Sequence, residues 1–92
     1  MTLRFASRAI NQLGAIREYL TSRRPESAEL VRGRILATIG RLRELPRMGD
    51  TGTVGGTREL GVAGLPYAIV YRIAGNDDEL AILGVFHAGQ NR

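Results

Sequence analysis

The first half of the chain carries apolar residues at helical spacing. Residues 2–6 are predicted to form a short strand, and Ser7 suits the N-cap of a helix that runs to about residue 23. A second helix is predicted from Pro25, which fits a first helical turn, to about residue 45. Only a few residues join the helices, so an antiparallel hairpin is expected. The apolar stripes are Ala6, Ala9, Ile10, Leu13, Ile16 and Leu20 in the first helix and Ala28, Val31, Ile35, Ile39 and Leu42 in the second.

The second half switches to a period of two after a glycine-rich loop at residues 47–56. This period predicts strands at residues 58–62, 67–73 and 79–87, with a turn at residues 75–78 between the last two. The third strand is apolar on both faces, so it is covered on both sides, or on one side by another chain. Its two expected faces are Leu80, Ile82 and Phe86, and Ala81, Leu83 and Val85.

The order β-α-α-β-β-β predicts an α+β fold, in which an antiparallel sheet carries the helical hairpin on one face. Residues 1–92 are few enough to form a single domain. Because only one two-helix layer is available, the other face of the sheet is short of cover. We therefore expect another chain to supply the missing layer.

Composition is that of an ordinary globular protein, with 43% apolar and 24% charged residues. No segment approaches the roughly 20 apolar residues that span a bilayer, so no membrane partner is expected. The first ten residues lack the basic and then apolar regions of a secretion signal, and a cytoplasmic location is expected. The absence of cysteine excludes disulfides and thiolate zinc sites. We expect no cofactor and no metal.

The basic residues are distinctive because all 13 are arginine and none is lysine, and the net charge is +4. The guanidinium group keeps its charge and presents a planar fork that suits phosphate and carboxylate groups. An acidic partner or nucleic acid is one explanation of this bias. A GC-rich genome, which favours arginine codons, is the other. In either case no side-chain amine is available for catalysis.

The segments TRELGVAGLPYAIVYRI and ELAILGVFHAGQNR resemble the RelE/ParE toxins of bacterial type II toxin–antitoxin systems. The family pattern is Arg-x-Leu, a short turn, Pro-Tyr, a Val-Tyr-Arg strand and then Ile-Leu-x-Val-x-His. The early Ala-x-x-Ile-x-x-Leu helix and the Pro-x-Met-Gly loop also fit, so the resemblance covers nearly the whole chain. It implies the RelE/ParE-like fold and a small toxin that a cognate antitoxin, ParD-like or similar, holds inactive. The antitoxin typically wraps an extended or helical tail around the toxin.

One branch of this family cleaves messenger RNA in the ribosomal A site. Such cleavage needs a proton acceptor, cations beside the phosphate and an acid for the leaving oxygen. On this alternative the catalytic residues are Arg58, Arg72, His87 and Arg92. The chain departs from that branch because it lacks lysine, has Ala88 after the histidine and has no aromatic residue after Arg92. No catalytic residue is therefore assigned firmly.

The other branch, the ParE-like toxins of plasmid stabilisation systems, poisons DNA gyrase and is more similar to this chain at Pro66–Tyr67 and Val70–Arg72. Poisoning is a binding event that traps the cleaved DNA–enzyme complex, so it requires no catalytic set. Electrostatic attraction to DNA needs no sequence choice. The candidate partner-binding residues are Arg58, Tyr67, Tyr71, Arg72, His87 and Arg92.

Structural roles remain open for the same residues. Arg58 could form a salt bridge to a neighbouring glutamate, the two tyrosines could lie in the core, and His87 could simply close a strand. A third hypothesis is a non-toxic adaptor or DNA-binding protein. Nothing in the sequence resembles a helix-turn-helix reader, so operator DNA is expected as a partner only through the toxin–antitoxin complex.

Overall fold

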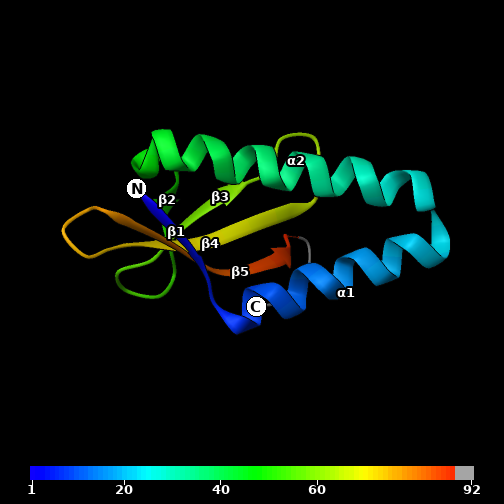
Figure 1. Cartoon of the computed structure of the whole chain (residues 1–92), viewed down its shortest axis with the longest axis horizontal. Coiled ribbons are helices and arrows are strands. Elements are labelled where there is room, and N and C mark those ends of the chain that lie inside the picture. The colour runs from blue at the N-terminus through cyan, green and yellow to red at the C-terminus, as the bar shows by residue number, and fades with distance from the viewer. Residues whose placement is uncertain (89–92) are drawn as a thin grey trace.

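The computed structural model of the chain describes residues 1–88 (Figure 1). The helices and strands follow the predicted order, with a short 3-10 turn (η1) and one extra strand in the predicted glycine-rich loop. The elements are β1 (Thr2–Phe5), α1 (Ser7–Arg23), α2 (Pro25–Glu44), η1 (Pro46–Met48), β2 (Asp50–Thr51), β3 (Arg58–Gly61), β4 (Tyr67–Ala74) and β5 (Glu79–His87). Among these residues, neither helix has the length and apolar character needed to cross a membrane.

The five strands form one sheet in the order β1-β5-β4-β3-β2. The α+β class is confirmed, but the sheet is mixed and not wholly antiparallel as predicted. β1 lies parallel to β5, with Thr2 opposite Glu79 and Phe5 opposite Ile82. Parallel neighbours need a long connection, and here all the other elements lie between the two strands in the chain. The sequence pattern cannot reveal this pairing, because strand direction depends on the route of the whole chain.

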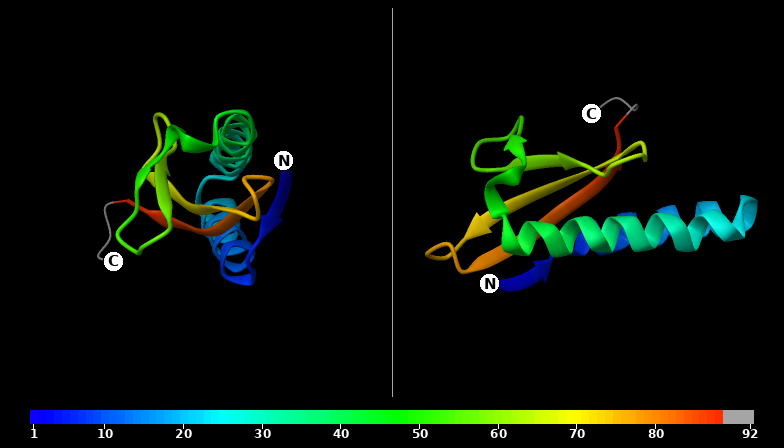
Figure 2. Two further views of the ribbon diagram at one scale, coloured as in Figure 1. Left: turned by 90° about the vertical axis from the view of Figure 1, so that its left-hand side faces the viewer. Right: turned by 90° about the horizontal axis from the view of Figure 1, so that it is seen from above.

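Both helices lie on the same side of the sheet (Figure 2), as predicted, and the core is formed between them and the strands. Burial of these apolar side chains is the main favourable contribution to folding. The core consists of Ala9 from α1, Val31, Ile35, Ile39 and Leu42 from α2, Val62 after β3, Tyr67, Ile69 and Tyr71 from β4, and Leu80, Ile82 and Val85 from β5.

The start of α1 differs slightly from the prediction. The helix begins at Ser7, and Ala6 is its N-cap, without a side-chain capping bond. The Ala6 N–H donates to the Ile82 carbonyl at 2.9 Å, so this residue still continues the pairing of β1 with β5. The sheet therefore fixes the point at which the helix begins.

A β-bulge in β5 changes which side chains face the helices. Val70 pairs with Gly84 and Tyr71 pairs with Ile82, so Leu83 is the extra residue. An extra residue reverses the alternation beyond it, and the predicted division of β5 into two faces was wrong after this point. Val85, only 1% exposed, joins the core.

Tyr71 joins the sheet to the turn that follows α2. Its ring is fully buried, and its hydroxyl donates to the Pro46 carbonyl at 2.6 Å and accepts the Gly49 N–H at 2.9 Å. These two backbone groups are held by a side chain rather than by a strand. The hydroxyl therefore fixes how the chain leaves the helix and enters the sheet.

We expect Tyr71→Phe to lower the free energy of unfolding by about 1–3 kcal/mol, because it leaves two backbone groups without their partner. Urea denaturation followed by circular dichroism measures this change. Tyr19→Phe is the matched control, since the Tyr19 side chain is 56% exposed, and its effect should stay within about 0.5 kcal/mol. Equal stability of the two variants would contradict the role assigned to the Tyr71 hydroxyl.

Candidate partner-binding surfaces

The side chain of Arg58 is hydrogen-bonded to the protein backbone. It pairs with Tyr71 across β3 and β4, on the face of the sheet that the helices cover. Its guanidinium Nη1 donates to the Gly49 carbonyl at 2.8 Å and to the Arg47 carbonyl at 3.4 Å. Arg58 and Tyr71 thus hold the same segment after α2. In place of the salt bridge to a glutamate that was one alternative for Arg58, the structure shows bonds to backbone oxygens.

Tyr67 and His87 lie together near the other end of β4. They are opposite each other in the pairing of β4 with β5, and their rings meet edge to face, with centroids 5.6 Å apart at an angle of 78°. Tyr71 lies four residue steps along β4 from Tyr67, which corresponds to about 13 Å along a strand. The histidine is therefore far from Arg58.

Arg72 lies at a third place. It follows Tyr71 in β4, so its side chain leaves the opposite face of the sheet, where it is exposed. Arg92 lies outside the described residues. The structure therefore brings Tyr67 and His87 together, and Arg58 and Tyr71 together, but it does not gather Arg58, Arg72 and His87 around one point.

An open cleft of about 480 Å³ lies between α1 and the edge of β5. β1 ends at Phe5, opposite Ile82, so it does not cover the rest of that edge. Gln12 of α1 takes over part of this role, because its Oε1 accepts the Val85 N–H at 2.7 Å. We call this cavity the aromatic cleft; it is lined by Gln12, Ala15, Ile16, Tyr19, Tyr67, Val85, Phe86 and His87.

The Tyr67 hydroxyl stays protonated over an extended pH range. Burial raises its pKa above the ordinary value of 10.0, and repulsion from the nearby Tyr19 oxygen raises it further. The neutral phenol is a hydrogen-bond donor. At neutral pH the cleft therefore contains a phenol that can donate to a ligand.

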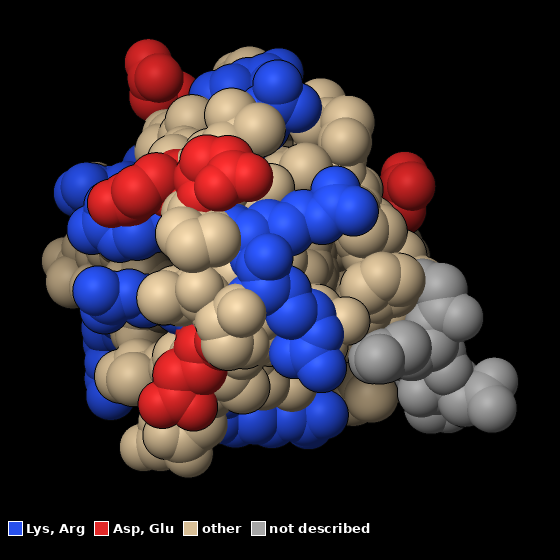
Figure 3. All heavy atoms as spheres, turned by 90° about the vertical axis from the view of Figure 1, so that its right-hand side faces the viewer, with Lys and Arg blue, Asp and Glu red and all other residues tan. Residues whose placement is uncertain are grey.

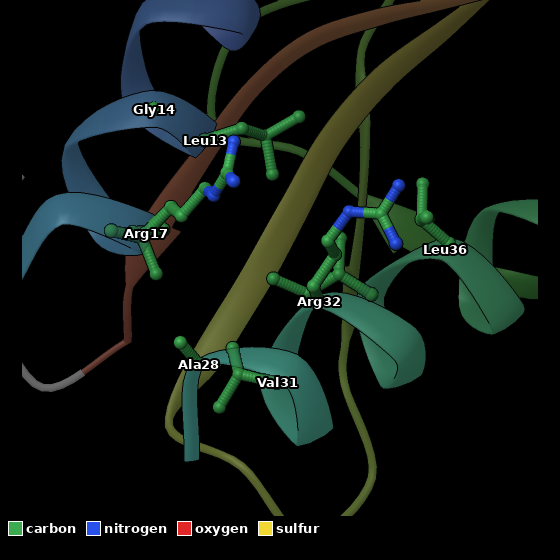
Figure 4. A pocket seen from close by; sticks show the side chains of 9 residues that line it. Leu13, Gly14, Arg17, Ala28, Val31, Arg32 and Leu36 are labelled. Atoms are coloured by element: carbon green, nitrogen blue, oxygen red, sulfur yellow. The ribbon is translucent and has the colours of Figure 1, made fainter. Parts of the chain in front are cut away.

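A second cavity, of about 250 Å³, opens between the two helices and is mainly apolar. Arg17 of α1 and Arg32 of α2 lie on either side of it (Figure 4). Leu36 at its margin is 41% exposed. Within residues 1–88 neither arginine has an ion-pair partner. We call this cavity the helical groove; it is lined by Leu13, Gly14, Ile16, Arg17, Ala28, Val31, Arg32, Ile35 and Leu36.

The end of the molecule at the turn between the helices is predominantly basic. Seen from that end, the surface shows more arginine than acidic side chains (Figure 3). Arg23 and Arg24 belong to this turn. A surface of this kind attracts polyanions or acidic proteins over several ångströms.

Comparison with known proteins identifies the family. Residues 3–92 match the family model described as ParE toxin of type II toxin-antitoxin system, parDE. A relative from Sinorhizobium fredii, named "Putative toxin Y4kP", is 38% identical over 88 residues, which are 96% of this chain and 88% of the relative. The chain belongs to the ParE toxin family. The predicted membership of the RelE/ParE toxins is confirmed, and the chain is the toxin of a type II toxin–antitoxin module.

Solved structures support the ParE fold. The chain is similar to the chromosomal ParDE toxin–antitoxin system from P. aeruginosa, with a TM-score of 0.84, 24% identity and coverage of 95% of both chains. It is also similar to the intact E. coli RelBE toxin–antitoxin complex, with a TM-score of 0.70, 18% identity and coverage of 97% of this chain and 98% of that one. At these identities the two likenesses establish the fold, which both family branches share.

Two surface residues of this ParE toxin were not singled out from the sequence as functional candidates. Tyr19 lies on α1 outside its apolar stripe, and Leu36 flanks the stripe of α2. Both are large apolar side chains at positions that a helical wheel assigns to solvent. This mismatch was the feature of the sequence that could have marked them as functional candidates. Which cavity each one borders depends on the packing of α1 against α2 and β5, and helical periodicity does not contain that information.

The two arginines of the sheet provide a test of these environments. We expect Arg58→Ala to lower the free energy of unfolding by about 1.5–3 kcal/mol, because it removes charge-assisted bonds to two carbonyl groups. Arg72→Ala, on the neighbouring strand, should change it by less than about 0.5 kcal/mol because its side chain is exposed. Thermal and urea unfolding measure both. Full stability of Arg58→Ala combined with lost toxicity would instead indicate a direct functional role.

Proposed function

We propose that this ParE-family toxin acts as a poison of DNA gyrase by binding, and that it is not an enzyme. The supporting observation is the separation of Arg58, Arg72 and His87. Cleavage of RNA requires a proton acceptor and cations around one phosphate. Arg58 is bonded to the turn after α2, and Arg72 lies on the other face of the sheet. A binding poison needs no such convergence.

The test is controlled expression in a bacterial host, together with a DNA cleavage assay that uses purified toxin and gyrase. We expect filamentous cells, a DNA-damage response and accumulation of gyrase-linked breaks, because trapping the cleaved complex prevents resealing. In the purified assay the breaks should require both proteins. His87→Ala should not abolish growth inhibition, since no proton transfer is proposed for the histidine.

The RelE-like alternative, a ribosome-dependent mRNA endonuclease, predicts a different result. It would give rapid arrest of translation and cut messages, with both effects lost in His87→Ala. That outcome would overturn the proposal of gyrase poisoning. Folding of the variant, checked by circular dichroism, separates loss of chemistry from loss of structure.

We also propose that the helical groove receives a segment of the cognate antitoxin, ParD-like or similar. The groove is apolar at its floor, and Arg17 and Arg32 flank it without acidic partners among residues 1–88. This combination suits an amphipathic segment whose apolar residues enter the groove and whose acidic residues meet the two guanidinium groups. Operator DNA would be contacted only through the toxin–antitoxin complex, in the cytoplasm, and the module would serve plasmid stabilisation.

Two leucines of α2 provide a matched test of the antitoxin site. Leu36→Glu introduces a charge at the margin of the groove and should weaken antitoxin binding at least about tenfold, the change that corresponds to about 1.4 kcal/mol. Leu30→Glu is the control, because Leu30 is 53% exposed on the same helix but does not line the groove. Calorimetry or surface plasmon resonance measures both affinities. Equal weakening by the two variants would place the antitoxin elsewhere.

A further inference from the structure

Four aromatic residues of this small toxin line the aromatic cleft. The sequence contains three tyrosines, two phenylalanines and one histidine. Phe5 and Tyr71 pack in or against the core. The other four residues line the cleft; Tyr67 is also part of the core, and Phe86, which follows the core-facing Val85, extends toward the opposite face of the sheet. Aromatic rings in an open cavity offer flat faces and edges to a ligand.

Hydrogen-bond donors accompany these rings. The Tyr67 hydroxyl has no partner among residues 1–88, and no buried side-chain oxygen or nitrogen there is left unsatisfied, so the hydroxyl reaches the open cleft. Gln12 uses its oxygen for the Val85 N–H, which fixes the amide and leaves its nitrogen as a second donor. None of the residues that line the cleft is acidic. The cleft therefore favours a ligand that supplies acceptors and no positive charge.

A cation lies at the margin of the cleft. The guanidinium carbon of Arg23 is 4.1 Å from the centroid of the Tyr19 ring, a cation–π contact that holds the arginine beside the cleft. Tyr19 itself is mostly exposed. A ligand with a flat ring and a phosphate could contact the Tyr19 ring and the Arg23 guanidinium at the same time.

We propose that the aromatic cleft binds an unpaired nucleobase of single-stranded nucleic acid. The base stacks on the face of Tyr19 that Arg23 does not cover, its carbonyl oxygens or ring nitrogens accept from Tyr67 and Gln12, and the adjacent phosphate meets Arg23. Stacking of bases on aromatic side chains tolerates any sequence, and every base offers an acceptor to the two donors. The choice of nucleic acid rests in part on the proposed function. The cleaved DNA–gyrase complex contains DNA, and the alternative target, the ribosome with its message, contains RNA.

The experiment measures binding of labelled oligothymidylate, of oligouridylate and of an abasic sugar–phosphate oligomer of the same length by fluorescence anisotropy. The purified toxin should bind the oligomers with bases at least about tenfold more tightly than the abasic one, which has the same charge. Tyr19→Leu should remove most of this difference, whereas Tyr19→Phe, which keeps the ring, should retain it. Tyr67→Phe should weaken binding severalfold because it removes one donor.

Equal affinity for the abasic oligomer, or wild-type binding by Tyr19→Leu, would overturn the base-binding proposal and leave only general attraction to arginine. A preference for oligothymidylate or for oligouridylate distinguishes a DNA ligand from an RNA ligand. Growth inhibition and gyrase-linked breaks are measured separately. If the gyrase-linked breaks occur but bases are not bound, the cleft proposal fails and gyrase poisoning stands. If bases are bound but no gyrase-linked breaks occur, gyrase poisoning fails and the cleft proposal stands.

Discussion

The α1–α2 hairpin packs its apolar stripes onto one face of the sheet, and the remaining features of the molecule depend on this contact. Ile35, Ile39 and Leu42 of α2 are buried in the same core as Tyr71 and Ile82 of the sheet. Among the described residues of this 92-residue chain there is no further α-helix to place on the other face or above the hairpin. Surfaces for partners therefore arise where this single layer is incomplete, between its two helices and at the edge of β5.

The two cavities differ in chemistry because different elements border them. The helical groove lies between two helices, whose facing residues are apolar and whose margins carry arginine. The aromatic cleft lies where β1 ends and α1 passes the edge of β5, so strand-end aromatic residues and a helix amide meet there. Under the two proposals, the helical groove would take an antitoxin segment and the aromatic cleft a nucleobase, and the two cavities adjoin at Ile16, which lines both.

Much of the fold could be predicted from local pattern, and much of the site could not. The helical stripes and the alternation in β4 are patterns of nearby residues. The ends of both helices and of that strand were therefore predicted within one residue. The roles of Arg58 and Tyr71 depend on carbonyl and N–H groups of residues 46–49, which belong to a separate part of the sequence. A side chain with such partners looks the same in sequence as one that faces a ligand.

The sequence by itself determined the element order, the family and the strong arginine bias, because periodicity and motif order are properties of neighbouring residues. Only the tertiary structure decided the parallel pairing of β1, the bulge at Leu83 and the separation of Arg58, Arg72 and His87. Strand direction, register and burial arise from contacts between segments distant in the chain. The same contacts place His87 beside Tyr67 in an aromatic cleft, where the sequence had shown only an isolated histidine near the end of the chain.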